Sequence, residues 1–407
     1  MTEQRRAGRP DFWLIGVTAA LVAVGLSAVY SASFALGYAD YHNVNYFIVK
    51  QAEAAAIGVV LLFACYALPY GWLRGFSPLI MLCSLVALLA VLLPHIGVRS
   101  NGASRWIALG PLPPLEPSEF AKLAMVIYIA AWLAAKGDNI KSISLGVLPF
   151  CTMVGLVGGL ILLEPDMGTA IVITLTTVTM FFVAGASLKH VLMLFVTGIA
   201  AGTPLMIQQG YRSSRMIAFL DPEKDPAGKG FHILQLLIAL GSGGIKGLGW
   251  GASRQKFFYV PGAHTDGIFA IIGEELGFLG CVFVIGLFAI FVWRGLRASY
   301  RAARGQDRFA SLLALGITCW IGYEAVINIG GITRSIPMTG VPLPLISYGG
   351  TAMMATLAAV GLLINVTRFL PAAEAEGRLP RRRAVTQTAR LRRRTGRTRR
   401  LPGGVTS

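Results

Sequence analysis

The chain has 407 residues, of which 55% are hydrophobic and only 14% are charged, and its formal net charge is +17. Apolar runs of about 20 residues recur along most of its length, and such runs cross a hydrocarbon core of about 30 Å. Runs of this length and apolarity exclude a transmembrane β-barrel, so we predict an all-α polytopic membrane protein.

About ten transmembrane helices are expected along the chain. The basic stretch RRAGR precedes an apolar run that is too long for the core of a cleaved signal peptide, so we interpret that run as a retained first span. The five cysteines lie in apolar segments without metal-ligand spacing and are expected to be small buried hydrophobic residues rather than a disulfide framework. The predicted spans are 12–33, 46–68, 76–95, 118–136, 143–163, 166–184, 187–206, 266–294, 309–332 and 347–370.

Lysine and arginine in the short loops predict the orientation. If both termini are cytoplasmic, every short inner segment carries Lys or Arg, as in WRGLRASYRAARGQDR, which fits a multi-pass protein of the cytoplasmic membrane. A large extracytoplasmic loop of about 60 residues then joins spans seven and eight. This loop is basic, which indicates an anionic ligand at the outer face, and its segment GFHILQLLIALGSGG predicts a short interfacial helix.

The C-terminal segment differs in composition from the rest. Residues 1–370 form the predicted transmembrane domain, and residues 371–407 form a basic, disordered cytoplasmic tail with eleven arginines and two glutamates. A topology signal that contacts anionic membrane lipids explains this charge without nucleic acid. A docking site for a specific partner is the alternative.

Ionisable residues at the outer ends of the spans are candidate functional groups, because charges inside a membrane are costly. Glu119 and Lys122 are three residues apart on one helical face and can pair. This pair either packs two helices together or lets Glu119 hold Lys122 toward an anionic group. Arg105, beside Trp106, is either an interfacial anchor or a phosphate contact.

The sixth span begins with two acids around a proline. Glu164 and Asp166 there are expected to favour the helix dipole and to cap the helix. The threonines that follow are interpreted as packing or back-bonding residues rather than ligands; they are Thr174, Thr176 and Thr179.

The stretch VPGAHTDGIFAIIGEELGF places four polar residues at the start of the eighth span. Thr265 or Asp266 is a candidate helix cap. Glu274 and Glu275 lie about 12 Å deeper at 1.5 Å per residue, whereas two carboxylates around one glycosidic bond lie about 5–9.5 Å apart. Any chemistry therefore falls to Asp266 alone, with His264 as the rival base. The glutamates are expected to be structural.

Four motifs in order identify a resemblance. They are GASRWIALG with EPSEFAKL, EPDMGTA, the segment from GSGGIKGLGWG to GEELGFLG, and IPMTGVPLPLISYGG. Over residues 12–370 the chain resembles the SEDS family (shape, elongation, division and sporulation), whose best-known members are FtsW and RodA. The stretch GASRQKFFYVPGAHTD is more similar to the FtsW branch, while Glu116 stands where glutamine is common in the family.

The resemblance implies a peptidoglycan glycosyltransferase that polymerises lipid II at the outer face of the membrane with inversion and an undecaprenyl-diphosphate leaving group. It implies Asp266 as the catalytic base, with Lys122, Glu119 and Asp166 as site residues. Our further candidates for substrate contacts are Arg105, Arg212, Arg215, His264 and Ser347. A divalent cation, Mg²⁺ or Mn²⁺, is another candidate to meet the leaving charge, but no cluster in the sequence fixes a metal site.

The resemblance also implies partners, namely a class B penicillin-binding protein with transpeptidase activity and other divisome proteins. Two other functions are weighed against the polymerase. A lipid II flippase needs polar groups along a path through the membrane, whereas the polar groups here gather at one face. A non-catalytic divisome scaffold does not need Asp266.

Overall fold

The computed structural model describes residues 8–369 except 94–95, 101–102, 109–113, 209–218, 227 and 229. These residues are mainly helical. The helices are α1 (Phe12–Tyr41), α2 (Tyr46–Ala67), α3 (Tyr70–Leu92), α4 (Pro117–Lys136), α5 (Leu148–Leu163), α6 (Met167–Val183), α7 (Leu188–Gln208), α9 (Phe231–Ser242), α10 (Ile268–Arg304), α11 (Arg308–Ile332) and α12 (Gly350–Arg368). Short 3-10 turns at Gly137–Lys141 and Pro222–Lys224 and a π-helical turn at Ile143–Val147 complete the helical segments.

Each of the ten predicted spans coincides with a helix. Among the described residues, eight helices are long and apolar enough to cross a membrane, and α6 and α7 contribute shorter apolar segments. The span edges differ from prediction where helices continue past the apolar run. α1 has 30 residues and α10 has 37, so at 1.5 Å per residue both exceed a hydrocarbon core of about 30 Å. The predicted short helix between spans seven and eight is α9.

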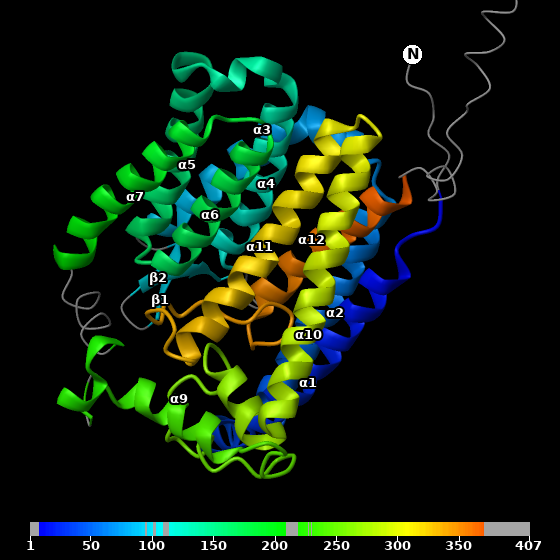
Figure 1. Cartoon of the computed structure of the whole chain (residues 1–407). Coiled ribbons are helices and arrows are strands. Elements are labelled where there is room, and N and C mark those ends of the chain that lie inside the picture. The colour runs from blue at the N-terminus through cyan, green and yellow to red at the C-terminus, as the bar shows by residue number, and fades with distance from the viewer. Residues whose placement is uncertain are drawn as a thin grey trace, which may run out of the picture. The chain divides into compact units, whose positions relative to one another are not determined.

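Three helices form the centre of the bundle. Most residues of α4, α11 and α12 are buried, whereas most of α2 and α3 face outward. Figure 1 shows α11 and α12 passing through the middle of the bundle with α1 and α10 side by side along one flank. Side chains on α4 and α11 therefore lie in the protein interior.

A two-stranded ribbon was not predicted. β1 (Gly97–Ser100) and β2 (Ala103–Ile107) pair antiparallel with an irregularity between Val98 and Arg99, and Ile107 bridges to Leu115. The segment RSNGASRWIALG has too few apolar residues for a span, and local pairing satisfies its backbone groups instead. The ribbon and α9 lie at the end of the bundle where α10 begins (Figure 1).

Other predictions have mixed outcomes. All five cysteines lie in the described ranges and are free, but only Cys281 is buried and Cys83 is exposed, so the burial predicted for all five is wrong for Cys83. Two of the predicted threonines of α6 bond back along their own helix, since Thr174 donates to Ala170 O and Thr179 to Leu175 O, whereas the Thr176 hydroxyl is buried without a partner in the described part of the chain. The basic tail beyond residue 370 lies outside the described residues, and its disorder stays a prediction.

Candidate functional site

A buried ion triad joins α4 to α11. Lys122 Nζ lies 2.9 Å from the Glu119 carboxylate on its own helix and also donates a hydrogen bond to Glu324 of α11. All three residues are less than 5% exposed. The predicted pairing of Glu119 with Lys122 is confirmed, but Lys122 is shared between two carboxylates, which compensate the cost of burying its charge.

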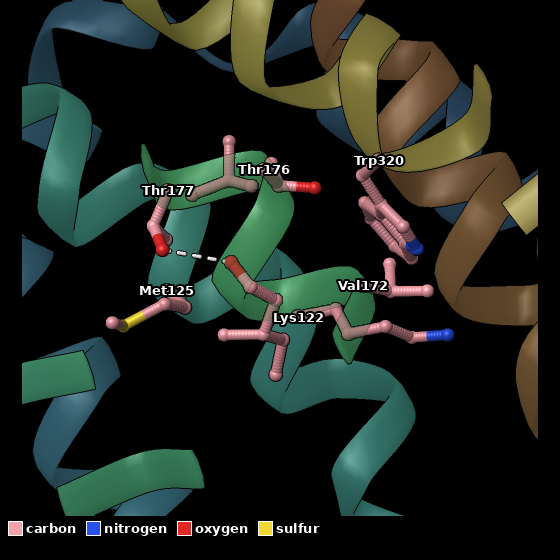
Figure 2. Close-up of a pocket in the computed structure, with 8 residues that line it drawn as sticks. Lys122, Met125, Val172, Thr176, Thr177 and Trp320 are labelled. Atoms are coloured by element: carbon pink, nitrogen blue, oxygen red, sulfur yellow. Dashed lines mark hydrogen bonds between the residues drawn. The ribbon is translucent and has the colours of Figure 1, made fainter. Parts of the chain in front are cut away.

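Lys122 also contacts an aromatic ring. Its Nζ lies 5.2 Å from the centre of the Trp320 ring, within the range of a cation–π interaction. Figure 2 shows the Lys122 side chain extended toward Trp320, beside a narrow gap whose wall includes Val172 and Thr176 of α6. The gap has no room for a water molecule, so the Lys122 ammonium is held by protein groups.

A second charged group surrounds the turn between α5 and α6. Arg105 of β2 donates from Nε to Glu164 O at 3.0 Å and from Nη2 to Pro165 O at 2.5 Å. Its Nη1 lies 3.9 Å from Asp166 Oδ2. Asp166 caps α6 by accepting from Thr169 N at 3.1 Å, as predicted. Arg105 therefore anchors this turn and keeps a positive charge beside Asp166.

Two acids near this turn have raised pKa values. Burial, reinforced by Asp166 and Glu116, raises the pKa of Glu164 to about 8. Burial, reinforced by Glu119 and Asp166, raises the pKa of Glu116 to about 8. Within the described part of the chain, neither carboxylate oxygen of Glu164 has a hydrogen-bond partner. The cap predicted for Glu164 is therefore wrong, because the α6 amide is taken by Asp166.

The turn that carries Asp266 is held by side chains from two other segments. Asn328 of α11 donates to Asp266 O at 3.0 Å and to Val341 O at 2.8 Å. Ser347 donates to Thr265 O at 2.6 Å, and Asp266 Oδ1 accepts from Thr265 Oγ at 3.1 Å. The Asp266 side chain stays partly exposed. The backbone of this turn is thus fixed by Asn328 and Ser347, and Asp266 remains partly exposed.

Neither predicted helix cap at this turn is formed. Gly267 occupies the N-cap position of α10, and Asp266 Oδ1 accepts instead from its neighbour Thr265. His264 packs between Phe47 and Tyr348, with ring centres 4.8 and 5.4 Å away. Burial lowers the pKa of His264 to about 4, against the opposing effect of Asp266. The lowered pKa makes His264 a weaker base than an ordinary imidazole, and its contacts with Phe47 and Tyr348 restrict the ring, while His264 and Asp266 are both partly exposed.

One face of α11 connects the triad to the Asp266 turn. Trp320, Glu324 and Asn328 are spaced four residues apart and therefore lie on one face of the helix. The first two contact Lys122, and the third holds Asp266. The 333–349 loop adds a second link: Val341, bonded to Asn328, packs on Gly168, two residues after Asp166.

Comparison with known proteins identifies the family. Residues 12–371 match the FtsW/RodA/SpoVE family, described as cell cycle proteins. The chain is 40% identical to stage V sporulation protein E of Bacillus subtilis over 360 residues, which covers 88% of this chain and 97% of that protein. It is 39% identical to a probable peptidoglycan glycosyltransferase FtsW of Trichlorobacter lovleyi, with 92% and 97% covered.

The chain belongs to the FtsW/RodA/SpoVE family.

Solved structures of the FtsW/RodA/SpoVE family share this fold. The chain superposes with a TM-score of 0.72 and 29% identity on a chain from a study of polymerization and crosslinking by a peptidoglycan synthase complex, with 88% of this chain and 98% of that chain covered. For RodA of Thermus thermophilus the TM-score is 0.64, the identity is 27%, and 88% and 97% of the two chains are covered. The all-α membrane fold predicted from the sequence is confirmed.

Two residues of the candidate site, Glu324 and Asn328, escaped the sequence prediction. Glu324 lies in the middle of a predicted span, where an ionisable residue is by default a functional candidate. That signal was available, because 309–332 contains no other acid. Conversely, the predicted pyrophosphate contacts Arg212 and Arg215 lie outside the described residues, so their role stays a prediction.

The residues that the structure describes include no group of three or more His, Cys, Asp or Glu side chains placed to hold a metal ion. Asp166 is instead paired with Arg105 and bonded to a backbone amide, and Glu164 and Glu116 have raised pKa values. The divalent cation considered from the sequence therefore has no set of protein ligands in the described ranges, and no chemical step here is assigned to it.

Proposed function

We propose that this chain is a peptidoglycan glycosyltransferase that polymerises lipid II at the outer face of the cytoplasmic membrane, with Asp266 as the catalytic base. The observation that carries the proposal is the Asp266 turn: a partly exposed carboxylate whose backbone is tied by Asn328 and whose preceding residue is tied by Ser347. The names of the FtsW and RodA relatives support the same chemistry.

The reaction needs one base and a positive environment for the leaving group. Asp266 takes the proton from the acceptor sugar hydroxyl as that oxygen attacks the anomeric carbon of the donor sugar. The bond to undecaprenyl diphosphate breaks and its electrons leave with the diphosphate, so the α-linked donor becomes β-linked in one inversion. Arg105, which is 27% exposed in its side chain, is our candidate for a direct diphosphate contact.

Lys122 has a different proposed role from the one expected of a phosphate ligand. Its ammonium is buried between Glu119 and Glu324. Lys122 therefore stabilises the packing of helices around the site and does not contact the substrate directly. We propose that the triad fixes α4 against α11 and so sets the distance between the Asp166 corner and the Asp266 turn. His264 and Ser347 are then positioning residues of that turn.

The membrane setting follows from the same residues. We propose that the end of the bundle carrying Asp266 faces outward and that both termini are cytoplasmic, because the short loops at the other end carry the excess of Lys and Arg. One structural relative comes from a complex that combines polymerization with crosslinking. We therefore propose a class B penicillin-binding protein as partner of this chain, which supplies the crosslinking activity.

A lipid II flippase is the second candidate function. It would require polar groups along a path between the two ends of the bundle. The charged groups of the site instead lie near the first turns of α4, α6 and α10, and the buried Lys122 is paired with Glu119 and Glu324. This distribution favours an enzyme over a transporter.

The test is polymerisation of purified lipid II in vesicles that contain the protein and its crosslinking partner, with glycan chains separated on a gel. Wild type and Asp266→Asn are compared, because asparagine keeps the volume and the backbone contacts but cannot accept the proton. Asp221→Asn is the matched control, since Asp221 lies in the same large loop and is half-exposed beside Lys224.

Wild type and Asp221→Asn are expected to make chains, while Asp266→Asn makes at least about 100-fold less, in line with the usual contribution of a general base. Chains from Asp266→Asn at the wild-type rate would refute the site assignment and move the test to His264→Gln. If wild type makes no chains but transfers lipid II across the same vesicles, the flippase is the correct function. If it does neither yet recruits the partner, it is a scaffold.

A further inference from the structure

Two adjacent glutamates inside α10 have no place in the proposed chemistry, yet both are almost completely buried. Glu274 is 1% exposed and Glu275 is 2% exposed. Burying two carboxylates next to each other is costly unless each is paired or hydrogen-bonded. Their partners come from a single short segment of the large loop, residues 251–256, and from α1.

Glu275 is the centre of a charged contact among three segments. Its Oε1 lies 2.9 Å from Lys256 Nζ, accepts from Ser31 Oγ of α1 at 2.6 Å, and accepts from Ser253 N at 3.3 Å. Lys256 Nζ also donates to Gly251 O at 2.6 Å and lies 4.8 Å from the centre of the Phe34 ring. The side chain of this lysine is fully buried, so the ion pair is not screened by water.

Glu274 binds the backbone of the same segment. Its carboxylate accepts from Ser253 Oγ at 2.5 Å, from Arg254 N at 2.9 Å and from Gln255 N at 3.4 Å. One side chain thus satisfies two consecutive amides that belong to no helix or strand. The segment 251–256 is fixed by side chains of α10, not by secondary structure of its own.

The main chain adds further contacts where α10 is kinked. Gly277 has φ 68° and ψ −165°, which interrupts the helix. The carbonyls of Glu274 and Glu275 accept from Leu248 N and Gly249 N, each at 3.0 Å. A Cβ atom at Gly277 would lie 2.3 Å from Gly247 N. The kink therefore allows the loop to approach the helix backbone directly.

These non-covalent contacts close a loop of the chain that contains Asp266. Nine residues separate Lys256 from Asp266, and the chain then continues along the first turns of α10 to Glu275, which forms an ion pair with Lys256. Turns at Gln255–Val260 and Gly262–Gly267 restrict the backbone between Lys256 and Asp266. The segment that follows Asp266 is helical from Ile268. The chain segments on both sides of Asp266 are thus fixed at the buried Lys256–Glu275 pair.

We propose that Lys256, Glu274 and Glu275 are positioning residues for the glycosyl transfer and that their contacts hold the Asp266 turn in its reactive place. This proposal rests on the proposed function, because it assigns the residues to the reaction of that same site. A displacement of about 1 Å of a catalytic group can lower a rate by about 100-fold. The Lys256–Glu275 pair lies about two helical turns from Asp266. Its loss would release the segments on both sides of Asp266 and so allow such a displacement.

The experiment compares Glu275→Gln, Lys256→Met and the double variant with wild type. The glutamine can still accept hydrogen bonds from Ser31 and Ser253, and the double variant leaves no unpaired buried charge. Each protein is reconstituted with its partner, and kcat and KM for lipid II are measured per folded molecule. Amide hydrogen exchange of residues 250–267 is measured on the same preparations.

The matched control is an ion pair of α10 that lies outside the chain segment carrying Asp266. Arg294 of α10 binds Asp11 at the start of α1, at the opposite end of both helices from Asp266. Arg294→Met removes this α1–α10 ion pair without altering the segment that leads to Asp266. A merely structural role predicts that Glu275→Gln, Lys256→Met and Arg294→Met lose activity equally at equal thermal stability.

The proposal predicts that Glu275→Gln and Lys256→Met lower kcat about 10- to 100-fold while KM stays within about twofold, with faster exchange confined to residues 250–267. Wild-type kcat in these variants, or a loss no larger than in Arg294→Met of the same stability, would overturn it. Glu274→Gln carries the same test if Glu275→Gln does not fold. A wild-type protein without polymerase activity would refute the proposed function, while the exchange pattern would still decide whether these residues hold the turn.

Discussion

Lys122 of α4 donates a hydrogen bond to Glu324 of α11 inside the bundle, and Asn328, one turn further along α11, donates to the Asp266 carbonyl. A charge on the fourth span is therefore connected to the candidate base on the eighth through a single helical face. The relationship links the buried Lys122 to the proposed site without a direct substrate contact.

The triad predicts unequal effects of removing its members. Lys122→Met leaves Glu119 and Glu324 buried together without a cation, and breaking such a buried pair costs about 3–5 kcal/mol. Glu324→Gln leaves one carboxylate paired with Lys122 and keeps an acceptor for it. We expect a large fall in the thermal midpoint and loss of polymerisation for Lys122→Met and a small change for Glu324→Gln. Thermal unfolding in detergent measures both, with exposed Glu53→Gln as control; equal losses in the two variants would contradict this account.

Asn328 offers a test of the link between α11 and the catalytic turn. Asn328→Leu leaves the carbonyls of Asp266 and Val341 without their donor, at a cost of about 1–3 kcal/mol for each buried group. Asn365 is a matched control, because it also donates to two carbonyls, those of Cys65 and Leu68. We expect both leucine variants to lose similar stability, but only Asn328→Leu to lose polymerisation per folded molecule. Equal activity in the two variants would show that Asn328 does not act through the turn.

The protonated acids near Arg105 predict a pH dependence of stability. The pKa of Glu164 is raised from 4.5 to about 8, so folding takes up a proton between these pH values. The free energy of unfolding therefore falls as pH rises from about 4.5 to about 8, by up to about 1.4 kcal/mol per pH unit for each such group. Glu164→Gln is expected to flatten this slope and to raise stability most at pH 8. A slope equal to that of wild type would mean that Glu164 is ionised in the folded protein.

Two glycines of the large loop provide a backbone test. Gly247 and Gly244 both have positive φ, 82° and 54°, so alanine is unfavourable at each by about 1–2 kcal/mol. Only at Gly247 would the added Cβ lie 2.1 Å from Glu275 O, whereas at Gly244 nothing lies within 4 Å. We expect Gly247→Ala to destabilise the protein more, by a further 1–3 kcal/mol or so from overpacking. Chemical denaturation of the two variants compares them, and equal losses would show that the loop does not dock on the α10 kink.

The sequence by itself determined which segments of this protein form helices. Runs of apolar residues predicted ten spans that all appear as helices, because their backbone groups must be satisfied within the segment in a membrane. The pairing of Glu119 with Lys122 and the cap by Asp166 were also predictable, since each involves residues within four positions in the chain.

Only the tertiary structure decided which distant residues meet. Glu324 reaches Lys122 from 202 residues away, Lys256 reaches Glu275 across a helix kink, and Asn328 reaches Asp266 from another helix. Apolar periodicity does not encode such contacts, because they depend on how helices pack and on where Gly277 interrupts α10. The buried position of Lys122 likewise follows from α4 and α11 lying at the centre of the bundle, which no local pattern reveals.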